Sequence, residues 1–197
     1  MTVNLFSLLN QTNWRLGMPI TIIIDIINAL YFIFPAYCAN AAPVIFGGGA
    51  PIDAGKKFLD GKPILGSHKT FRGFFVGLAI GTFVGFVQYI FFQSSDFFKE
   101  VLQFQFSISL GFMLSLGALV GDLIESFFKR RLGLRPGSPL LIADQLDFVV
   151  VALLFSLPVS PPPLLIVLII IVITPPIHLL TNFLGNLLRK KKVLPVS

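Results

Sequence analysis

The sequence predicts an all-α membrane protein: a polytopic bundle of five transmembrane helices in a single domain, residues 1–197, with two loops forming a site. Hydrophobic residues make up 55% of the 197-residue chain and charged residues only 12%. The mean hydropathy of +0.87 is too high for a water-soluble domain. No segment of about 100 residues has the polarity of a separate aqueous domain, so the helices are surrounded by lipid.

Five apolar stretches are candidates for crossing a bilayer, which requires about 20 apolar residues per helix. The fully apolar part of the fourth stretch, Phe148–Leu157, is too short to span by itself. Its helix is therefore predicted to begin near Leu140. The five predicted spans cover approximately residues 20–39, 74–92, 104–128, 140–157 and 164–188.

The Lys and Arg residues predict how these spans are oriented. Most of the fifteen basic residues follow the first, third and fifth spans, and short loops rich in Lys and Arg stay on the cytoplasmic side. We therefore expect a multi-pass protein of the cell membrane whose N-terminus is outside and whose C-terminus and active site are cytoplasmic.

Small residues in the second span form a regular pattern. Gly73, Gly77, Gly81 and Gly85 are four residues apart, which predicts a smooth ridge that another helix can approach closely. This is a packing feature and carries no chemistry.

Three polar residues within the spans have roles that the sequence leaves open. Asp25 and Asn28 are expected to face the bundle interior, either as structural hydrogen-bonding groups or as substrate contacts. His178 follows Pro175-Pro176, a pair that should bend the last helix. A packed core position is favoured for His178 over exposure at the bend.

Two pairs of acidic residues point to a metal site. Asp122 and Glu125 lie near the end of the third span, and Asp144 and Asp147 lie in the first turns of the fourth. Residues three apart share one face of a helix, so four carboxylates would meet at one pocket. They would repel one another, and Mg²⁺, which prefers oxygen ligands, would relieve the repulsion and recruit phosphates.

An ion-pair network is the alternative interpretation of the first pair. Asp122 and Glu125 would then bind Lys129 and Arg130 as interfacial ions with snorkelling side chains. That interpretation leaves the second acidic pair unexplained, so metal or phosphate chemistry is favoured.

The segment between the first two spans is rich in Gly and Lys. Glycines let backbone amides converge on anions, and lysines act as mobile charges for phosphates, so this loop suits a triphosphate. It could instead set the topology or meet anionic lipid head groups. A nucleic-acid partner is not expected, because the basic residues are confined to loops and the aromatic residues are almost all Phe within spans.

Two motifs resemble those of the CDP-archaeol synthases, archaeal relatives of the phosphatidate cytidylyltransferases. The run Gly121–Phe148 contains GDLIESFFKRR, GSPLL and DQLDF, and the loop Gly61–Gly73 reads GKPILGSHKTFRG, similar to the nucleotide-side motif of the family. The chain has Leu134-Arg135 where the phosphatidate enzymes have Lys-Asp, which places it with the archaeal branch.

The resemblance implies a Mg²⁺-dependent nucleotidyltransferase of membrane phospholipid biosynthesis. The phosphate of an ether lipid, 2,3-di-O-geranylgeranyl-sn-glycerol 1-phosphate, would attack the α-phosphorus of CTP, giving CDP-archaeol and pyrophosphate. A phosphate nucleophile needs no general base at neutral pH, so positioning and charge stabilisation should dominate.

Residue roles are assigned from this chemistry. Mg²⁺ would be held by Asp122, Asp144 and Asp147. The catalytic set adds Glu125, Lys129 and Arg130. CTP would be bound by Lys56, Lys62, Ser67, His68, Lys69 and Arg72, and the lipid phosphate by Arg131 and Arg135.

Two other functions are considered. An ion or metal transporter could also carry carboxylates in its spans, but no internal repeat is visible and the acidic residues lie at one face. Another Mg²⁺-dependent lipid head-group phosphotransferase, such as a CDP-alcohol phosphotransferase, would need a different spacing, because the last two aspartates here are three apart. The sequence leaves the oligomeric state open.

Overall fold

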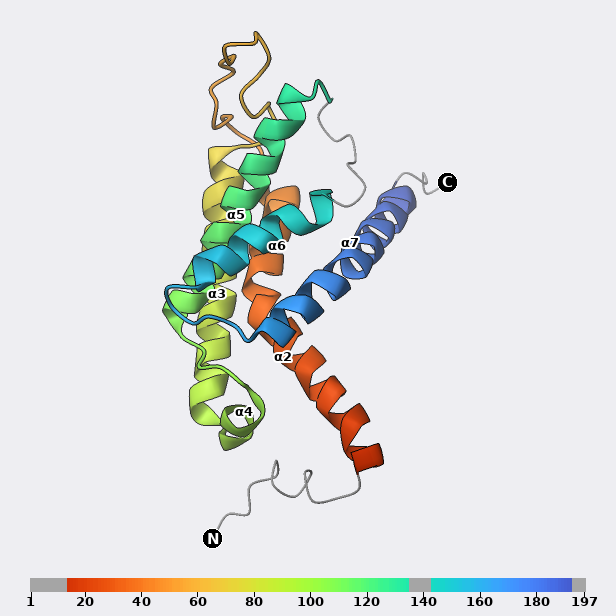
Figure 1. Cartoon of the computed structure of the whole chain (residues 1–197). Coiled ribbons are helices and arrows are strands. Elements are labelled where there is room, and N and C mark those ends of the chain that lie inside the picture. The colour runs from red at the N-terminus through yellow and green to blue at the C-terminus, as the bar shows by residue number, and fades with distance from the viewer. Residues whose placement is uncertain (1–13, 135–142, 193–197) are drawn as a thin grey trace.

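The computed structural model describes residues 14–134 and 143–192, and its regular elements are helices (Figure 1). Within these residues the only β pairing is two isolated bridges in one loop. The all-α class is therefore confirmed. The helices are α2 (Trp14–Phe46), α3 (Phe71–Ser94), α4 (Asp96–Val101), α5 (Ile108–Arg131), α6 (Ala143–Ser156) and α7 (Leu164–Lys192).

Four of the described helices are long and apolar enough to cross a membrane, so the chain is a multi-pass membrane protein. They are the spans Ile20–Phe46, Phe71–Ser94, Ile108–Arg131 and Leu164–Thr181. Helix α6 has 14 residues, which at 1.5 Å per residue is about 21 Å, shorter than the ~30 Å hydrocarbon core. The predicted start of this span, near Leu140, lies outside the described residues.

The first span extends further than its hydropathy indicated. Asn40 and Pro43 looked like the start of a loop, yet α2 continues to Phe46. The ring of Pro43 packs on α3, where a Cβ added at Gly73 would lie 3.2 Å from the Cβ of Pro43. This tertiary contact offsets the local cost of proline in a helix. The helix ends where Gly48 adopts a φ of 107°, a backbone conformation that favours glycine.

The glycine ridge of α3 is confirmed. All four glycines are buried. A Cβ at Gly81 would lie 2.7 Å from the Cβ of Ala39 in α2, and one at Gly85 would lie 2.6 Å from the Cα of Gly111 in α5. Helix α3 therefore packs backbone to backbone against both α2 and α5.

Glycines of α5 also fix the position of α6. A Cβ at Gly117 would lie 2.7 Å from the Cα of Ala152, and one at Gly121 would lie 2.7 Å from the Cα of Phe148. Residue numbers rise along α5 as they fall along α6, so the two helices are antiparallel. This register places the start of α6 beside the acidic part of α5.

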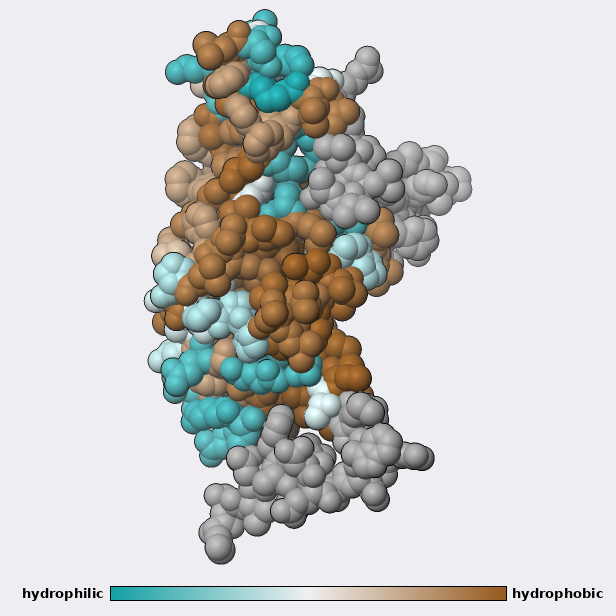
Figure 2. Space-filling model, viewed as in Figure 1, coloured by the Kyte–Doolittle hydropathy of each residue, from teal (hydrophilic) through white to brown (hydrophobic). Residues whose placement is uncertain are grey.

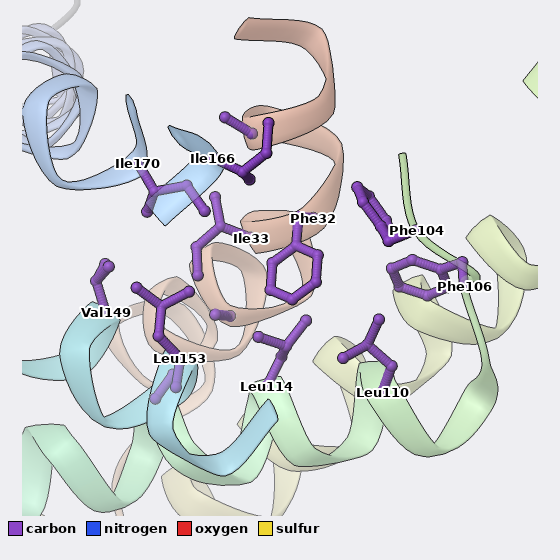
Figure 3. Packing of buried hydrophobic residues seen from close by; sticks show 14 of the residues in the cluster. Phe32, Ile33, Phe104, Phe106, Leu110, Leu114, Val149, Leu153, Ile166 and Ile170 are labelled. Carbon is purple, nitrogen blue, oxygen red and sulfur yellow. The ribbon is translucent and has the colours of Figure 1, made fainter. Parts of the chain in front are cut away.

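The apolar core joins all the long helices. Figure 3 shows Phe32 and Ile33 of α2 facing Leu114 of α5, Leu153 of α6 and Ile170 of α7. Figure 2 shows apolar residues over the middle of the visible face, with hydrophilic residues gathered toward the loop end and the α4 end. The polar groups that could carry chemistry are thus at the ends of the bundle.

Asp25 and Asn28 form structural hydrogen bonds at the α4 end. The buried Asn28 side chain donates to the carbonyl oxygen of Val101 at 3.0 Å and accepts from the backbone amide of Gln103 at 2.8 Å. The Gln103 side-chain amide donates to Asp25 Oδ1 at 2.6 Å. These bonds tie α2 to the end of α4 and to the segment that follows it, at the opposite end of the bundle from residues 47–70 (Figure 1).

Candidate active site

A cavity of about 700 Å³ lies at the loop end of the bundle. Its wall combines the end of α2, the loop of residues 47–70 (the 47–70 loop), the start of α3, and parts of α5, α6 and α7. Both polar and apolar side chains face it. The lining residues are Asn40, Pro43, Val44, Gly47, Gly48, Gly49, Ile52, Ser67, His68, Lys69, Thr70, Gly73, Phe74, Leu119, Asp122, Leu123, Glu125, Lys129, Asp147 and His178.

The 47–70 loop is folded around the buried side chain of Asp53. Its carboxylate accepts hydrogen bonds from the backbone amides of Gly55 at 3.0 Å, Leu65 at 3.0 Å and Gly66 at 2.8 Å. Burial of the carboxyl group opposes its ionisation, but these amide hydrogen bonds outweigh burial and lower the pKa of Asp53 below its ordinary value. An ionised Asp53 thus joins the two ends of the segment 53–66.

Lys69 is held in place by backbone pairing on both sides. The Ile52 amide donates to the Lys69 carbonyl oxygen at 2.8 Å. The next residue, Thr70, is the N-cap of α3, where its hydroxyl oxygen accepts from the Gly73 amide at 3.1 Å. The side chain of Lys69 then reaches across the cavity to α5, where Nζ lies 2.6 Å and 2.7 Å from the two carboxylate oxygens of Asp122.

A second group of charges lies one turn further along α5. Glu125 forms an ion pair with Lys129, four residues later on the same helix. Asp147 of α6 is close enough to hydrogen-bond to Glu125, and Asp122 adds negative charge nearby. The ion-pair interpretation is therefore right for Glu125 and Lys129, whereas Asp122 is paired with Lys69 of the 47–70 loop.

The donor chemistry of these side chains fits a hard divalent cation. Asp122, Glu125 and Asp147 supply three carboxyl groups, and Lys69 and Lys129 supply two cations beside them. Oxygen donors of this kind suit Mg²⁺. Within residues 14–134 and 143–192, no three acidic, His or Cys side chains already stand as a ligand set. The side chain of Asp144, a predicted ligand in the first turn of α6, lies outside the described part of the structure.

The predicted nucleotide-binding residues separate into two groups. Ser67, His68 and Lys69 line the cavity. The other three, Lys56, Lys62 and Arg72, are not among the described residues that form its wall. The loop thus brings the SHK part of its GKPILGSHKTFRG motif to the cavity and leaves the two more distant lysines and Arg72 outside the wall.

The predicted catalytic and lipid-phosphate residues also divide. Asp122, Glu125, Lys129 and Asp147 line the cavity, whereas Arg130 is buried beside it on α5. Arg131 contacts the 47–70 loop and is not part of the wall. The predicted role of Arg135 falls outside the described residues.

Sequence reasoning missed part of the wall. Asn40 and Gly47–Gly49 line the cavity because α2 runs about two turns longer than its apolar stretch indicated. His178, for which a core position was favoured, also lines it. A hydrogen bond of 2.7 Å between the hydroxyls of Tyr37 and Thr174 joins α2 to α7 one turn before His178, a pairing that spacing alone does not reveal.

Comparisons with known proteins give a consistent result. Residues 20–194 match the family model described as CarS-like, CDP-archaeol synthase. The CDP-archaeol synthase of Pyrococcus horikoshii is 48% identical over 86% of this chain and 96% of its own length. That of Methanococcus aeolicus is 46% identical over 88% of this chain and 98% of its own length.

A solved structure is also similar. It is described as an intramembrane enzyme for archaeal membrane lipids biosynthesis, and it is 33% identical with a TM-score of 0.68. The match covers 80% of this chain and 94% of the solved one.

Proposed function

Because this chain belongs to the CDP-archaeol synthase family and forms CDP-archaeol from CTP in lipid biosynthesis, we propose that the cavity of about 700 Å³ is its active site. The observation that carries this proposal is the convergence of Lys69, Asp122, Glu125 and Asp147 at that cavity. The same cavity meets the two substrate requirements, polar groups for phosphates and an apolar wall for a lipid.

The substrate we propose is the ether-lipid phosphate 2,3-di-O-geranylgeranyl-sn-glycerol 1-phosphate. An oxygen of its phosphate attacks the α-phosphorus of CTP and forms a new P–O bond. The bond from the α-phosphorus to the oxygen that bridges to the β-phosphate breaks, and pyrophosphate leaves with that electron pair. The attacking phosphate is already ionised at neutral pH, so the site has no proton to remove.

Repulsion between two polyanions is the barrier that the residues of this chain must lower. Lys69, a residue of the 47–70 loop, lines the cavity, where its side chain can move between Asp122 and a CTP phosphate. Ser67 and His68 face the same space and supply side-chain donors, and Gly48 and Gly49 form part of the same wall. The other three predicted CTP ligands, Lys56, Lys62 and Arg72, do not line the cavity and would contact CTP only outside it.

Enzymes of this class generally depend on a divalent metal ion. We propose Mg²⁺ as that ion and Asp122, Asp144 and Asp147 as its ligands, with Glu125 beside them held by Lys129. The bound ion would neutralise charge on the CTP phosphates and on the leaving pyrophosphate. The carboxylates have no other task in this proposal, since neither a nucleophile nor a general base is needed from them.

The lipid phosphate is assigned to the basic end of α5. Lys129 lines the cavity and Arg130 is buried next to it, and Arg135 follows in sequence. The cations there also complement the negative end of the α5 dipole. Val44 and Phe74 form an apolar part of the same wall, through which the lipid tails would reach the site sideways from the bilayer.

We further propose that α6 is the fifth crossing of a single-domain bundle. It runs antiparallel along α5 and carries Asp144 and Asp147 at the end where α5 carries Asp122 and Glu125. The distribution of Lys and Arg supports an external N-terminus and a cytoplasmic C-terminus, so the cavity would open to cytoplasmic CTP.

The position of the transferred label tests the reaction. Purified protein is incubated with Mg²⁺, the ether-lipid phosphate and CTP labelled at either the α- or the γ-phosphorus. Label from the α-position should enter the lipid, and label from the γ-position should appear in pyrophosphate. Lipid labelled from the γ-position would identify a kinase-type transfer and contradict the proposal.

A further inference from the structure

Arg131, at the end of α5, is enclosed by the 47–70 loop. Its guanidinium carbon lies 4.8 Å from the ring centre of Phe58 in the loop and 4.7 Å from that of Phe127 on α5. Attraction between a guanidinium and aromatic ring faces acts at such distances. The two rings also contact each other edge to face, with centres 5.3 Å apart.

Polar contacts of Arg131 complete this enclosure. Its Nε lies 3.0 Å from Oδ2 of Asp60, an ion pair that is not aligned as a hydrogen bond. Its terminal nitrogen donates to the carbonyl oxygen of Pro63. In the reverse direction, Lys62 Nζ donates to the backbone carbonyl oxygen of Arg131 at 2.8 Å.

The contacts that Arg131 makes with the loop all fall on one short hairpin, residues 56–64. Its two sides are paired through the hydrogen bond from the Phe58 amide to the Lys62 carbonyl, at 2.8 Å, and that from the Ile64 amide to the Lys56 carbonyl, at 3.1 Å. Asp53 closes its base through the amides of Leu65 and Gly66. The chain then passes without interruption into Ser67, His68 and Lys69.

The segment 56–69 is consequently attached to α5 at two points. Arg131 holds the hairpin, and Asp122 receives Lys69. Nine residues separate them on the helix, about 13 to 14 Å by helical rise. If the hairpin were released from Arg131, the residues before Lys69 would lose one of the two attachments that hold their segment on α5.

We propose that Arg131 is a positioning residue that holds the 56–64 hairpin on α5 and thereby places Ser67, His68 and Lys69 in the active site. This inference rests on the proposed CTP site. It replaces the lipid-phosphate role expected for Arg131 from the sequence, because the guanidinium is enclosed by two rings, an aspartate and a carbonyl oxygen of the chain itself. Lysine cannot reproduce this planar, multiply bonded arrangement.

Steady-state kinetics with both substrates varied separates the two roles. Arg131→Lys keeps the positive charge. It removes the planar guanidinium, which contacts the rings of Phe58 and Phe127 and donates to the Pro63 carbonyl oxygen. If Arg131 positions the loop, we expect KM for CTP to rise about tenfold or more, equivalent to ~1.4 kcal/mol, with KM for the lipid phosphate nearly unchanged. A rise confined to KM for the lipid phosphate would overturn the inference.

Phe58→Leu, in the loop, provides an independent variant. It should also raise KM for CTP. The double variant Phe58→Leu/Arg131→Lys should be less impaired than the product of the two single effects, because both substitutions remove the same contact between Arg131 and Phe58. Multiplicative effects would mean that the two residues act separately. Lys57→Gln, an exposed position on the same hairpin, is the control and should match the wild type.

Hydrogen exchange on the full-length protein in detergent gives a readout that does not depend on activity. Peptides covering residues 56–66 should exchange at least several-fold faster in Arg131→Lys and in Phe58→Leu than in the wild type, while peptides of α3 stay unchanged. Unchanged exchange in residues 56–66 would refute the positioning role. Failure of the wild type to use CTP would instead refute the proposed function and leave this exchange result as it stands.

Discussion

Nζ of Lys69 lies 2.6 Å and 2.7 Å from the two carboxylate oxygens of Asp122, so one ion pair connects the 47–70 loop to α5 across the cavity wall. Both partners are about three-quarters buried. This pair is the point where the two conspicuous sequence motifs, GSHK and GDLIES, meet in space.

Substitution of Lys69 by Met should impair catalysis strongly. The change removes the cation that we propose faces the CTP phosphates while keeping the length of the side chain, and loss of such an electrostatic contact costs on the order of 100-fold in kcat/KM. Initial rates at saturating lipid phosphate measure the effect. Lys99→Met is the matched control, because Lys99 forms its ion pair with Asp96 at the other end of the bundle and should retain full activity.

Asp144→Asn should abolish turnover without unfolding the bundle. Removing one carboxylate weakens metal binding by roughly 10- to 100-fold or more, so part of the activity should return when Mg²⁺ is raised far above its wild-type requirement. A Mg²⁺ titration of the rate, with circular dichroism as the check on folding, measures both effects. Wild-type activity at ordinary Mg²⁺ would remove Asp144 from the proposed ligand set.

The stabilising effect of Asp53 should depend on pH. Its pKa is lowered in the folded protein, so its contribution is complete above the unfolded pKa of about 3.9 and is lost as the pH falls through the lower folded value. The difference in Tm between wild type and Asp53→Asn should therefore be constant near pH 7 and shrink at acid pH. A difference that grows as the pH falls would mean that the carboxylate is not stabilised by the loop amides.

Gly81→Ala should destabilise the bundle. The added methyl group would lie 2.7 Å from the Cβ of Ala39 and 2.8 Å from the Pro35 carbonyl oxygen, so α2 and α3 must separate, at a cost of about 1 to 3 kcal/mol. Thermal unfolding in detergent measures the loss. Ala79→Leu, at an exposed position of α3, should leave Tm nearly unchanged, and an equal loss at both positions would contradict close packing at the ridge.

The orientation in the membrane can be tested with single cysteines. In a Cys38→Ser background, Thr2→Cys should react with a membrane-impermeant maleimide on intact cells, and Ser197→Cys should react only after permeabilisation. Labelling of both positions in intact cells would show an even number of crossings and exclude α6 as a fifth span.

The sequence predicted the helical class, the glycine ridge and the acidic end of α5 because each follows from a local pattern. Spacing of four residues marks a packing ridge, and three-residue spacing places two carboxylates on one face. The end of α2 was missed because it depends on Pro43 packing over Gly73 of another helix. Hydropathy along a single segment does not record that contact.

Roles in the candidate site were harder to predict for the same reason. The sequence grouped Lys69 with Lys56 and Lys62, since all three are lysines of one loop, and the fold separates them: Lys69 faces Asp122 whereas Lys62 bonds to the Arg131 carbonyl. Arg131 looked like one more phosphate ligand in a basic run. Its pairing with Phe58 and Asp60 depends on a hairpin more than seventy residues earlier.

The most direct test of the proposed site is transfer of α-labelled phosphate from CTP to the ether-lipid phosphate by Asp122→Asn, with Asp96→Asn measured in parallel. Asp96 undergoes the same chemical change at the far end of the bundle, where its ion pair with Lys99 is exposed. We predict at least a 100-fold loss for Asp122→Asn and none for Asp96→Asn. Equal lipid labelling by the two variants would contradict the assignment of this cavity as the active site.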